Sequence, residues 1–348
     1  MKKNLFICLC VLVCVCCLSS CSFSALECMP DDINMNYNNI RNRNGYWLTS
    51  DSVCYLSSSL FPTYYCVNKS SRINLGMSGG YGTGSVQRYR NKIYILNQTD
   101  FVDERNSVFE LKLYDIDSAK TTFLFSINNC EKFLVLDEDI YYSEYNWTNH
   151  TRVSTLKRYC IDSNEHEILG EQVLSFGVID NNVFYLAEEN GQIVVSQYND
   201  ETKSSIVKGA FSLGAEEIYN LKEYGEVSYT SSYLLFTITD YETEISNVVK
   251  YSFESNSLTS IKLDGYSNVF VAYNTCSYFI VYNEDADISE LYKLNNNTDE
   301  ITRLQKISGQ CGLFVGSDNG VYVYEHNDCI LNYYSDKANS RPTIVYRF

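Results

Sequence analysis

Short apolar and aromatic runs alternate with polar turns over most of the chain. In the clearest copy, residues 181–207, a run follows Asn181-Asn182, an acidic loop comes next, and a second run ends at Tyr198. A third short run follows Asn-Asp-Glu-Thr. Runs of this length suit strands, and the polar turns between them predict hairpins. One such unit cannot bury its apolar faces alone, so the pattern predicts that copies stack on each other.

The second strand of this unit recurs at regular intervals. Its copies begin at Val53, Ile93, Ile140, Val183, Leu234, Phe279 and Val321, spaced by 40, 47, 43, 51, 45 and 42 residues. A third-strand run that ends in an aromatic residue and a polar turn recurs in the same register, as in Leu111 to Asp115. The widest spacing contains an insertion, Glu216 to Tyr229.

Units of this length, with about four antiparallel strands and no helical period, predict an all-β β-propeller over residues 45–348. Seven four-stranded blades fit the spacing best. The last unit carries its own fourth strand, Thr343 to Arg347, so no amino-terminal strand is visible to complete it. Six or eight blades therefore remain compatible with the sequence.

The repeat also carries a family resemblance. Two stretches resemble the tyrosine-rich propellers of bacterial exported lipoproteins. One is Ile140-Tyr141-Tyr142, which follows a turn, and the other is Leu-Lys-x-Tyr-Asp-x-Asp at residues 111–117, which follows a loop. Those are similar to the YWTD propellers of low-density lipoprotein receptors, although Tyr-Trp-Thr-Asp itself does not occur here. The resemblance covers nearly all of the mature chain and implies no catalytic residues.

The amino end predicts export. Lys2 and Lys3 precede an uncharged run from Leu5 to Leu18, and 14 residues make a helix of about 21 Å, too short to span a bilayer. The run is therefore typical of a signal peptide, residues 1–20. Leu18-Ser19-Ser20-Cys21 resembles the lipobox of bacterial lipoproteins, which implies acylation at Cys21 and a lipid-anchored protein facing outside the cytoplasm. Residues 21–44 are polar and read as a flexible tether.

The net charge limits the classes of partner that the protein can bind. The formal net charge of -16 argues against nucleic acid and suits cationic partners, metal ions or simple solubility.

The cysteines beyond Cys21 are Cys28, Cys54, Cys66, Cys130, Cys160, Cys276, Cys311 and Cys329. Most lie within apolar runs, which favours buried thiols. Cys54 with Cys66 and Cys311 with Cys329 are the best candidates for disulfides.

Candidate binding residues lie in the loops between second and third strands, and the geometry of the repeat places these loops on one face of the propeller. The tentative ligand-binding residues there are Asp103, Glu104, Tyr145, Trp147, Asp240, Tyr241, Glu242, Asp285 and Asp287. Carboxylates and aromatic rings together suit a glycan, a cationic peptide or an envelope protein. Asp285-x-Asp287-x-Ser289 has the alternating oxygens of a calcium loop but lacks the glycine and glutamate of an EF-hand, so calcium stays an alternative and no other cofactor is expected.

Enzyme signatures are sparse. The three histidines, His150, His166 and His326, do not have the spacing of metal ligands. The Gly-rich stretch Gly76 to Ser85 precedes a strand and not a helix, which argues against a phosphate-binding loop. The sequence thus favours a non-enzymatic binding or scaffold module. The alternative is a carbohydrate-active enzyme that uses paired loop carboxylates.

Overall fold

A computed structural model describes residues 46–48, 52–56, 63–68, 72–77, 84–103, 106–137, 139–148, 151–179, 182–199, 202–223, 227–240, 245–273, 275–317 and 319–347. The expected signal peptide, Cys21 and the tether lie outside these residues.

The described residues form seven four-stranded antiparallel sheets. The first three contain β1 (Tyr46–Leu48), β2 (Ser52–Leu56), β3 (Thr63–Asn68) and β4 (Arg72–Met77); β5 (Gly84–Tyr89), β6 (Lys92–Asp103), β7 (Asn106–Asp115) and β8 (Lys120–Asn128); and β9 (Cys130–Leu136), β10 (Asp139–Thr148), β11 (Thr151–Cys160) and β12 (Glu165–Gly170).

The fourth and fifth sheets contain β13 (Val173–Ile179), β14 (Asn182–Glu189), β15 (Gln192–Asn199) and β16 (Ser204–Phe211); and β17 (Val227–Tyr229), β18 (Tyr233–Asp240), β19 (Ile245–Ser252) and β20 (Ser257–Asp264). The last two contain β21 (Tyr266–Ala272), β22 (Cys276–Asn283), β23 (Ile288–Asn295) and β24 (Ile301–Ser308); and β25 (Cys311–Ser317), β26 (Gly320–Glu325), β27 (Ile330–Ser335) and β28 (Thr343–Arg347).

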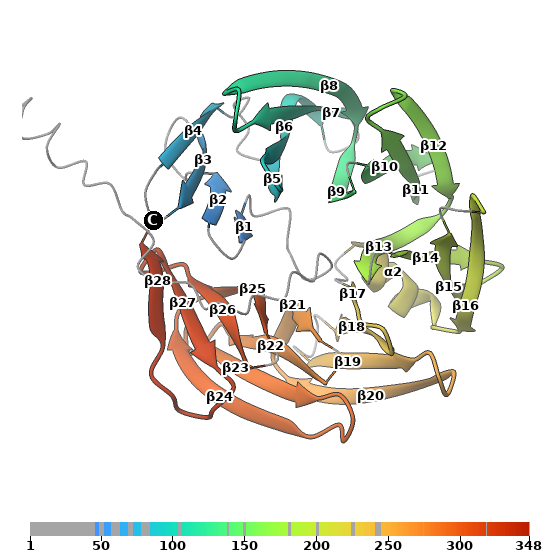
Figure 1. The fold of residues 1–348 in the computed structure, drawn as a ribbon. Coiled ribbons are helices and arrows are strands. Elements are labelled where there is room, and N and C mark those ends of the chain that lie inside the picture. Colours follow the sequence, from blue (N-terminus) through green and yellow to red (C-terminus); the bar gives the residue numbers. More distant parts are fainter. Residues whose placement is uncertain are drawn as a thin grey trace, which may run out of the picture.

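The sheets follow one another around a central axis, with the first strand of each toward the middle and the fourth at the rim (Figure 1). This confirms the expectation of an all-β propeller. The seven second-strand runs read from the sequence lie in β2, β6, β10, β14, β18, β22 and β26, one in each sheet. The repeat unit of the sequence therefore corresponds to one sheet of the structure.

The ends of the described chain stay in separate sheets. The first sheet is β1-β2-β3-β4 and the last is β25-β26-β27-β28, so no described sheet combines strands from both ends. Residues Thr343–Arg347 do form the fourth strand of the last sheet, as expected. Among the described strands, none is exchanged between the first and last sheets.

The turn between third and fourth strands has a local cause. The Asp115 carboxylate accepts a hydrogen bond from Ser118 N at 2.7 Å, and Ala119 follows with φ 53°. Asn199 and Thr202 repeat the contact at 2.9 Å in the fourth sheet, where Lys203 has φ 51°. A short polar side chain that bonds to the backbone three residues on stabilises such a chain reversal.

The hydrophobic core lies between adjacent sheets. One cluster joins the second sheet to the third through Tyr94, Leu96, Leu111, Phe133, Val135 and Ile140. A second joins the fourth to the fifth and includes Leu186, Val195, Leu234 and Phe236. Because strands alternate their side chains, each sheet can pack on both neighbours, which explains why the runs are apolar throughout.

The insertion before the fifth sheet contains a helix, α2 (Ala215–Glu223), which the strand repeat does not predict. Ile218 and Leu221 are buried in the cluster between the fourth and fifth sheets. Tyr219 on the same helix is exposed. Among the described residues, no helix is long and apolar enough to cross a bilayer.

The described cysteines are mostly buried thiols, as the apolar runs indicated. The suggested Cys54–Cys66 bridge is not formed: the two residues lie opposite each other on β2 and β3, and both side chains are thiols. The suggested Cys311–Cys329 bridge is not formed: Cys311 Sγ lies 3.9 Å from the carbonyl of Gly309, whereas Cys329 Sγ lies 3.6 Å from that of His326.

Candidate functional site

One face of the propeller carries two kinds of connection. Because strands alternate in direction, the loops between second and third strands and the links from one sheet to the next emerge on the same side. The link between β8 and β9 is a single residue, Asn129, whereas the link between β16 and β17 contains α2. This face therefore differs from one junction between sheets to the next.

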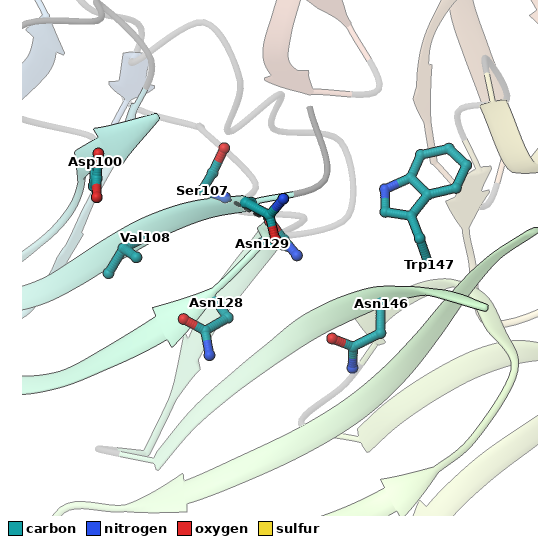
Figure 2. A pocket seen from close by; sticks show the side chains of 8 residues that line it. Asp100, Ser107, Val108, Asn128, Asn129, Asn146 and Trp147 are labelled. Carbon is teal, nitrogen blue, oxygen red and sulfur yellow. Dashed lines mark hydrogen bonds between the residues drawn. The ribbon is translucent and has the colours of Figure 1, made fainter. Parts of the chain in front are cut away.

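A pocket of about 530 Å³ opens on this face between the second and third sheets. Small-molecule sites have about this size. Its lining comes from the end of β6, the start of β7, the β8–β9 link and the end of β10: Asp100, Asn106, Ser107, Val108, Asn128, Asn129, Asn146 and Trp147. Figure 2 shows Asp100 and Trp147 at opposite ends of the view, with Ser107 and Asn129 between them. The lining is polar and has one aromatic ring.

Asn129 fixes the floor of the pocket. Its backbone N–H donates to Ser107 O at 2.8 Å, and its side-chain Oδ1 accepts from Ser107 N at 2.8 Å. Its Nδ2 donates to Tyr145 O at 3.2 Å, and its carbonyl accepts from Tyr145 N at 3.2 Å. Asn129 is buried and has φ 50°, a conformation that asparagine tolerates better than most residues. One residue thus joins β7 of the second sheet to β10 of the third.

Backbone bonds similar to those of Asn129 recur at other junctions. Glu188 N donates to Gln172 O at 3.1 Å between the third and fourth sheets, and Gly309 N donates to Asp287 O at 2.8 Å between the sixth and seventh. The backbone of the link is therefore part of the repeat. The Asn129 side chain adds bonds to this common frame.

The exposed amides lie beside this fixed floor. Asn128 and Asn146 are exposed, and neither side chain has a hydrogen-bond partner within the described part of the chain. Trp147 is half-buried, and Arg152 lies opposite it on β11. The Arg152 guanidinium stacks over the Tyr145 ring at 4.3 Å, so this cation is directed onto the aromatic ring of the same hairpin.

Of the residues expected from the sequence, Trp147 lines the pocket and Tyr145 supports it through Asn129. Asp103 ends β6 near the pocket, but its side chain and all of Glu104 lie outside the described residues. Asp240 ends β18, and its side chain, Tyr241 and Glu242 also lie outside them.

Asp285 and Asp287 belong to the β22–β23 loop of the sixth sheet and do not line the pocket. Asp287 Oδ1 accepts a hydrogen bond from the Tyr282 hydroxyl at 3.0 Å, which raises the pKa of Tyr282. The Ser289 hydroxyl is buried and donates to Gly309 O at 2.6 Å. Two of the three oxygens of the suggested calcium loop are thus engaged within the protein. No group of three or more His, Cys, Asp or Glu side chains suited to a metal occurs among the described residues.

Carboxylates of the third sheet outside the pocket lining are already paired. Glu144, on β10 before Tyr145, forms an ion pair with Lys157 on β11. Asp139 at the start of β10 pairs with Arg158, which also lies 3.5 Å from Glu167. These pairs stabilise the third sheet. They leave Asp100 as the carboxylate among the described residues that line the pocket.

No pattern in the sequence indicates the amide lining. Asn106, Asn128, Asn129 and Asn146 stand at strand ends, where asparagine is common as a turn residue. The useful signal was Trp147, because a tryptophan in a polar loop is rare and this chain has two tryptophans in all.

Comparisons with solved structures agree with the fold. The propeller domain of the Trilobed protease from Pyrococcus furiosus, described as having an open velcro topology, is 12% identical with a TM-score of 0.54; the match covers 93% of this chain and 98% of that one. Tricorn protease is 10% identical with a TM-score of 0.54, over 92% of this chain and 36% of that chain. Polysaccharide lyase Uly1 is 9% identical with a TM-score of 0.53, over 92% of both chains. At these identities the likeness shows the β-propeller fold alone.

No protein-family model matches the sequence, and no curated protein matches it either. The resemblance to bacterial lipoproteins and YWTD propellers therefore remains a prediction from the repeat and from residues 18–21.

Proposed function

We propose that the protein is a lipid-anchored, extracytoplasmic binding module that holds a small polar ligand in the pocket between the second and third sheets. The observation that carries the proposal is the composition of the lining: four amides, a hydroxyl, an indole and one carboxylate around about 530 Å³. Such groups orient a ligand through hydrogen bonds and a stacked ring.

The same lining argues against chemistry on the ligand. Glycoside hydrolysis needs two carboxyl groups about 5–10 Å apart, with the ligand between them. Among the described residues of the pocket, Asp100 has no second carboxylate beside it. His166 lies on β12, the rim strand of the third sheet, and does not line the pocket. A carbohydrate-active enzyme stays the competing function, with Asp100 as the first residue to test.

A ligand screen separates these functions. The mature protein would be screened by thermal shift against neutral and anionic oligosaccharides, cationic peptides and calcium. We expect one class to raise the Tm of the wild type and not that of the N128A/N146A double variant. Chromatography should recover the ligand unchanged. If the wild type forms a product and Asp100→Asn does not, the protein is an enzyme and the binding-module proposal is wrong.

The anchor is tested separately. Cys21→Ser removes the thiol that would be acylated, and one or more acyl chains are the expected membrane attachment. We expect the variant to move from the membrane to the soluble fraction with its far-ultraviolet circular dichroism unchanged. Retention of the variant in the membrane fraction would contradict lipid anchoring.

A further inference from the structure

We propose that the pocket is a subsite for a neutral sugar, with the Trp147 indole stacked on one face of a pyranose ring and the amides of Asn128 and Asn146 bonded to its hydroxyls. This inference rests on the proposed binding function and names the ligand class. Its elements are the Trp147 ring at one end of the lining (Figure 2), the exposed amides of Asn128 and Asn146, and a rigid floor.

Trp147 supplies the apolar surface. The residue is half-buried and lines the pocket. The face of a pyranose carries C–H groups, which pack on the electron-rich face of an aromatic ring. The sugar's hydroxyls then point outward around the ring, toward the polar part of the lining.

The amides match those hydroxyls. Each asparagine side chain offers two donors and a carbonyl acceptor without formal charge. A sugar hydroxyl both donates and accepts, so neighbouring hydroxyls can bond to the oxygen and the nitrogen of one amide. Asn128 ends β8 and Asn146 lies near the end of β10, so the two amides reach the pocket from different sheets.

Charge argues against an anionic ligand. No lysine or arginine lines the pocket among the described residues, Asp100 lines it, and the chain carries a formal charge of -16. A uronate or phosphate would therefore be repelled. Calcium normally takes about six to eight oxygen ligands, including several carboxylates, which this lining does not provide.

The floor of the pocket is preorganised. Asn129 uses its backbone and its side chain to hold Ser107 and Tyr145 at 2.8 to 3.2 Å. The backbone beneath Asn128 and before Asn146 is therefore fixed. A preorganised site loses less conformational entropy on binding, which favours weakly hydrophobic ligands such as sugars.

The connection beside the pocket is short. One residue, Asn129, links β8 to β9, as Gly265 alone links β20 to β21. Between the fourth and fifth sheets, α2 occupies the corresponding connection and buries Ile218 and Leu221 there. The pocket therefore lies at a junction that no described helix fills.

Intrinsic fluorescence provides a direct test. The chain has two tryptophans, Trp47 and Trp147, so Trp47→Phe leaves Trp147 as the sole indole reporter. We would titrate this variant with neutral tetrasaccharides of glucose, mannose, galactose and N-acetylglucosamine, and with tetragalacturonate as the anionic control. We expect a saturable fluorescence change with at least one neutral tetrasaccharide and none with tetragalacturonate.

Variants then locate the contact. Calorimetry should show that Trp147→Ala, Asn128→Ala and Asn146→Ala each raise the Kd for that tetrasaccharide about tenfold or more, the loss expected for one strong contact. Gln192→Ala is the matched control, because this exposed amide lies on the same face at the β14–β15 turn of the fourth sheet. It should leave the Kd unchanged, and urea unfolding should show that all four variants remain folded.

The outcomes separate the two proposals. If no neutral tetrasaccharide binds, but a peptide or metal raises the Tm and N128A/N146A abolishes that rise, the sugar subsite is wrong and the binding module stands. If sugar binding persists in both Trp147→Ala and the double variant, the subsite is also wrong. If no ligand class depends on these residues, both proposals fail.

Discussion

Gln87 on β5 accepts a hydrogen bond from the backbone N–H of Val135 on β9 at 3.1 Å. The other end of its amide donates to the carbonyl of Phe133. Gln87 has no exposed surface. β5 and β9 are the innermost strands of the second and third sheets and do not share a ladder. One side-chain amide thus makes the two bonds that a neighbouring strand would otherwise make.

Replacing Gln87 should therefore weaken the packing of these two sheets. We expect Gln87→Leu to lower the free energy of unfolding by about 2–4 kcal/mol, because two hydrogen bonds are lost and a buried N–H and C=O remain unpaired. Urea unfolding measures the change. The exposed Gln192→Leu is the control and should stay within about 0.5 kcal/mol of the wild type. An equal effect in both variants would mean that the Gln87 bridge contributes nothing.

Lys250 forms a comparable contact between the fifth and sixth sheets, on strands farther from the central axis. Its ammonium on β19 donates to Asn296 O at 2.9 Å and pairs with Asp299, both in the β23–β24 turn of the sixth sheet. The Lys250 side chain is 8% exposed and that of Asp299 is 38% exposed. We expect Lys250→Met to cost about 1–3 kcal/mol in urea unfolding, mainly for the bond to the Asn296 carbonyl. Lys262→Met, at an exposed position on β20, should have little effect.

The sequence predicts the strands and their grouping because those features are local. Period-2 runs, an Asp or Asn at the start of each turn, and a spacing of 40 to 51 residues all act within one unit. The position of Thr343–Arg347 in the last sheet follows from the same pattern. The local side-chain pattern and the tertiary fold favour the same strands and turns, so the repeat is visible in the sequence.

The pocket could not be read in this way. Asn106, Asn128 and Asn146 meet only when two sheets pack in one particular register, and each alone resembles a turn residue. α2 was missed because it has nine residues, of which Ile218 and Leu221 alone are described as buried. A helix this short is stabilised by its tertiary contacts more than by its sequence.

His166 should make stability depend on pH. Its Nδ1 lies 2.8 Å from the Tyr142 hydroxyl, and its ring contacts Tyr159 and Phe125 with centroids 4.8 and 4.9 Å apart. Burial lowers the pKa of His166 from its ordinary 6.5; nearby Lys157 lowers it further, whereas Glu144 raises it. The unfolded chain therefore binds more protons just below pH 6.5, so this contribution to stability is lost as pH falls through that range.

The pH effect can be isolated with one substitution. We would compare urea unfolding of the wild type and His166→Gln at pH 7.5 and 5.5, so that the titration of the many carboxylates cancels between them. The wild type should lose more stability over this interval. A larger loss in His166→Gln would contradict the direction of the His166 shift.

Cys54 and Cys66 should be convertible to a disulfide. They are direct cross-strand partners on β2 and β3, and both are buried. Such partners have Cα atoms about 4.5–5.5 Å apart, within the range of about 4.4–6.8 Å that a disulfide needs. We expect mild oxidation to yield a Cys54–Cys66 peptide by mass spectrometry and no Cys311–Cys329 peptide. Full alkylation of Cys54 and Cys66 after denaturation of the oxidised protein would contradict the prediction.

Asn129 connects the stability of the fold to the pocket. Asn129→Gly and Asn129→Ala both remove the amide bonds to Ser107 N and Tyr145 O, which should cost about 1–3 kcal/mol. Alanine should cost about 1 kcal/mol more than glycine, because φ 50° is unfavourable for a residue with a Cβ. Urea unfolding gives this difference directly. Asn129→Gly should remain folded yet lose affinity for the pocket ligand, because Asn128 would no longer rest on a fixed floor; unchanged affinity would mean that the Asn129 side chain does not position the site.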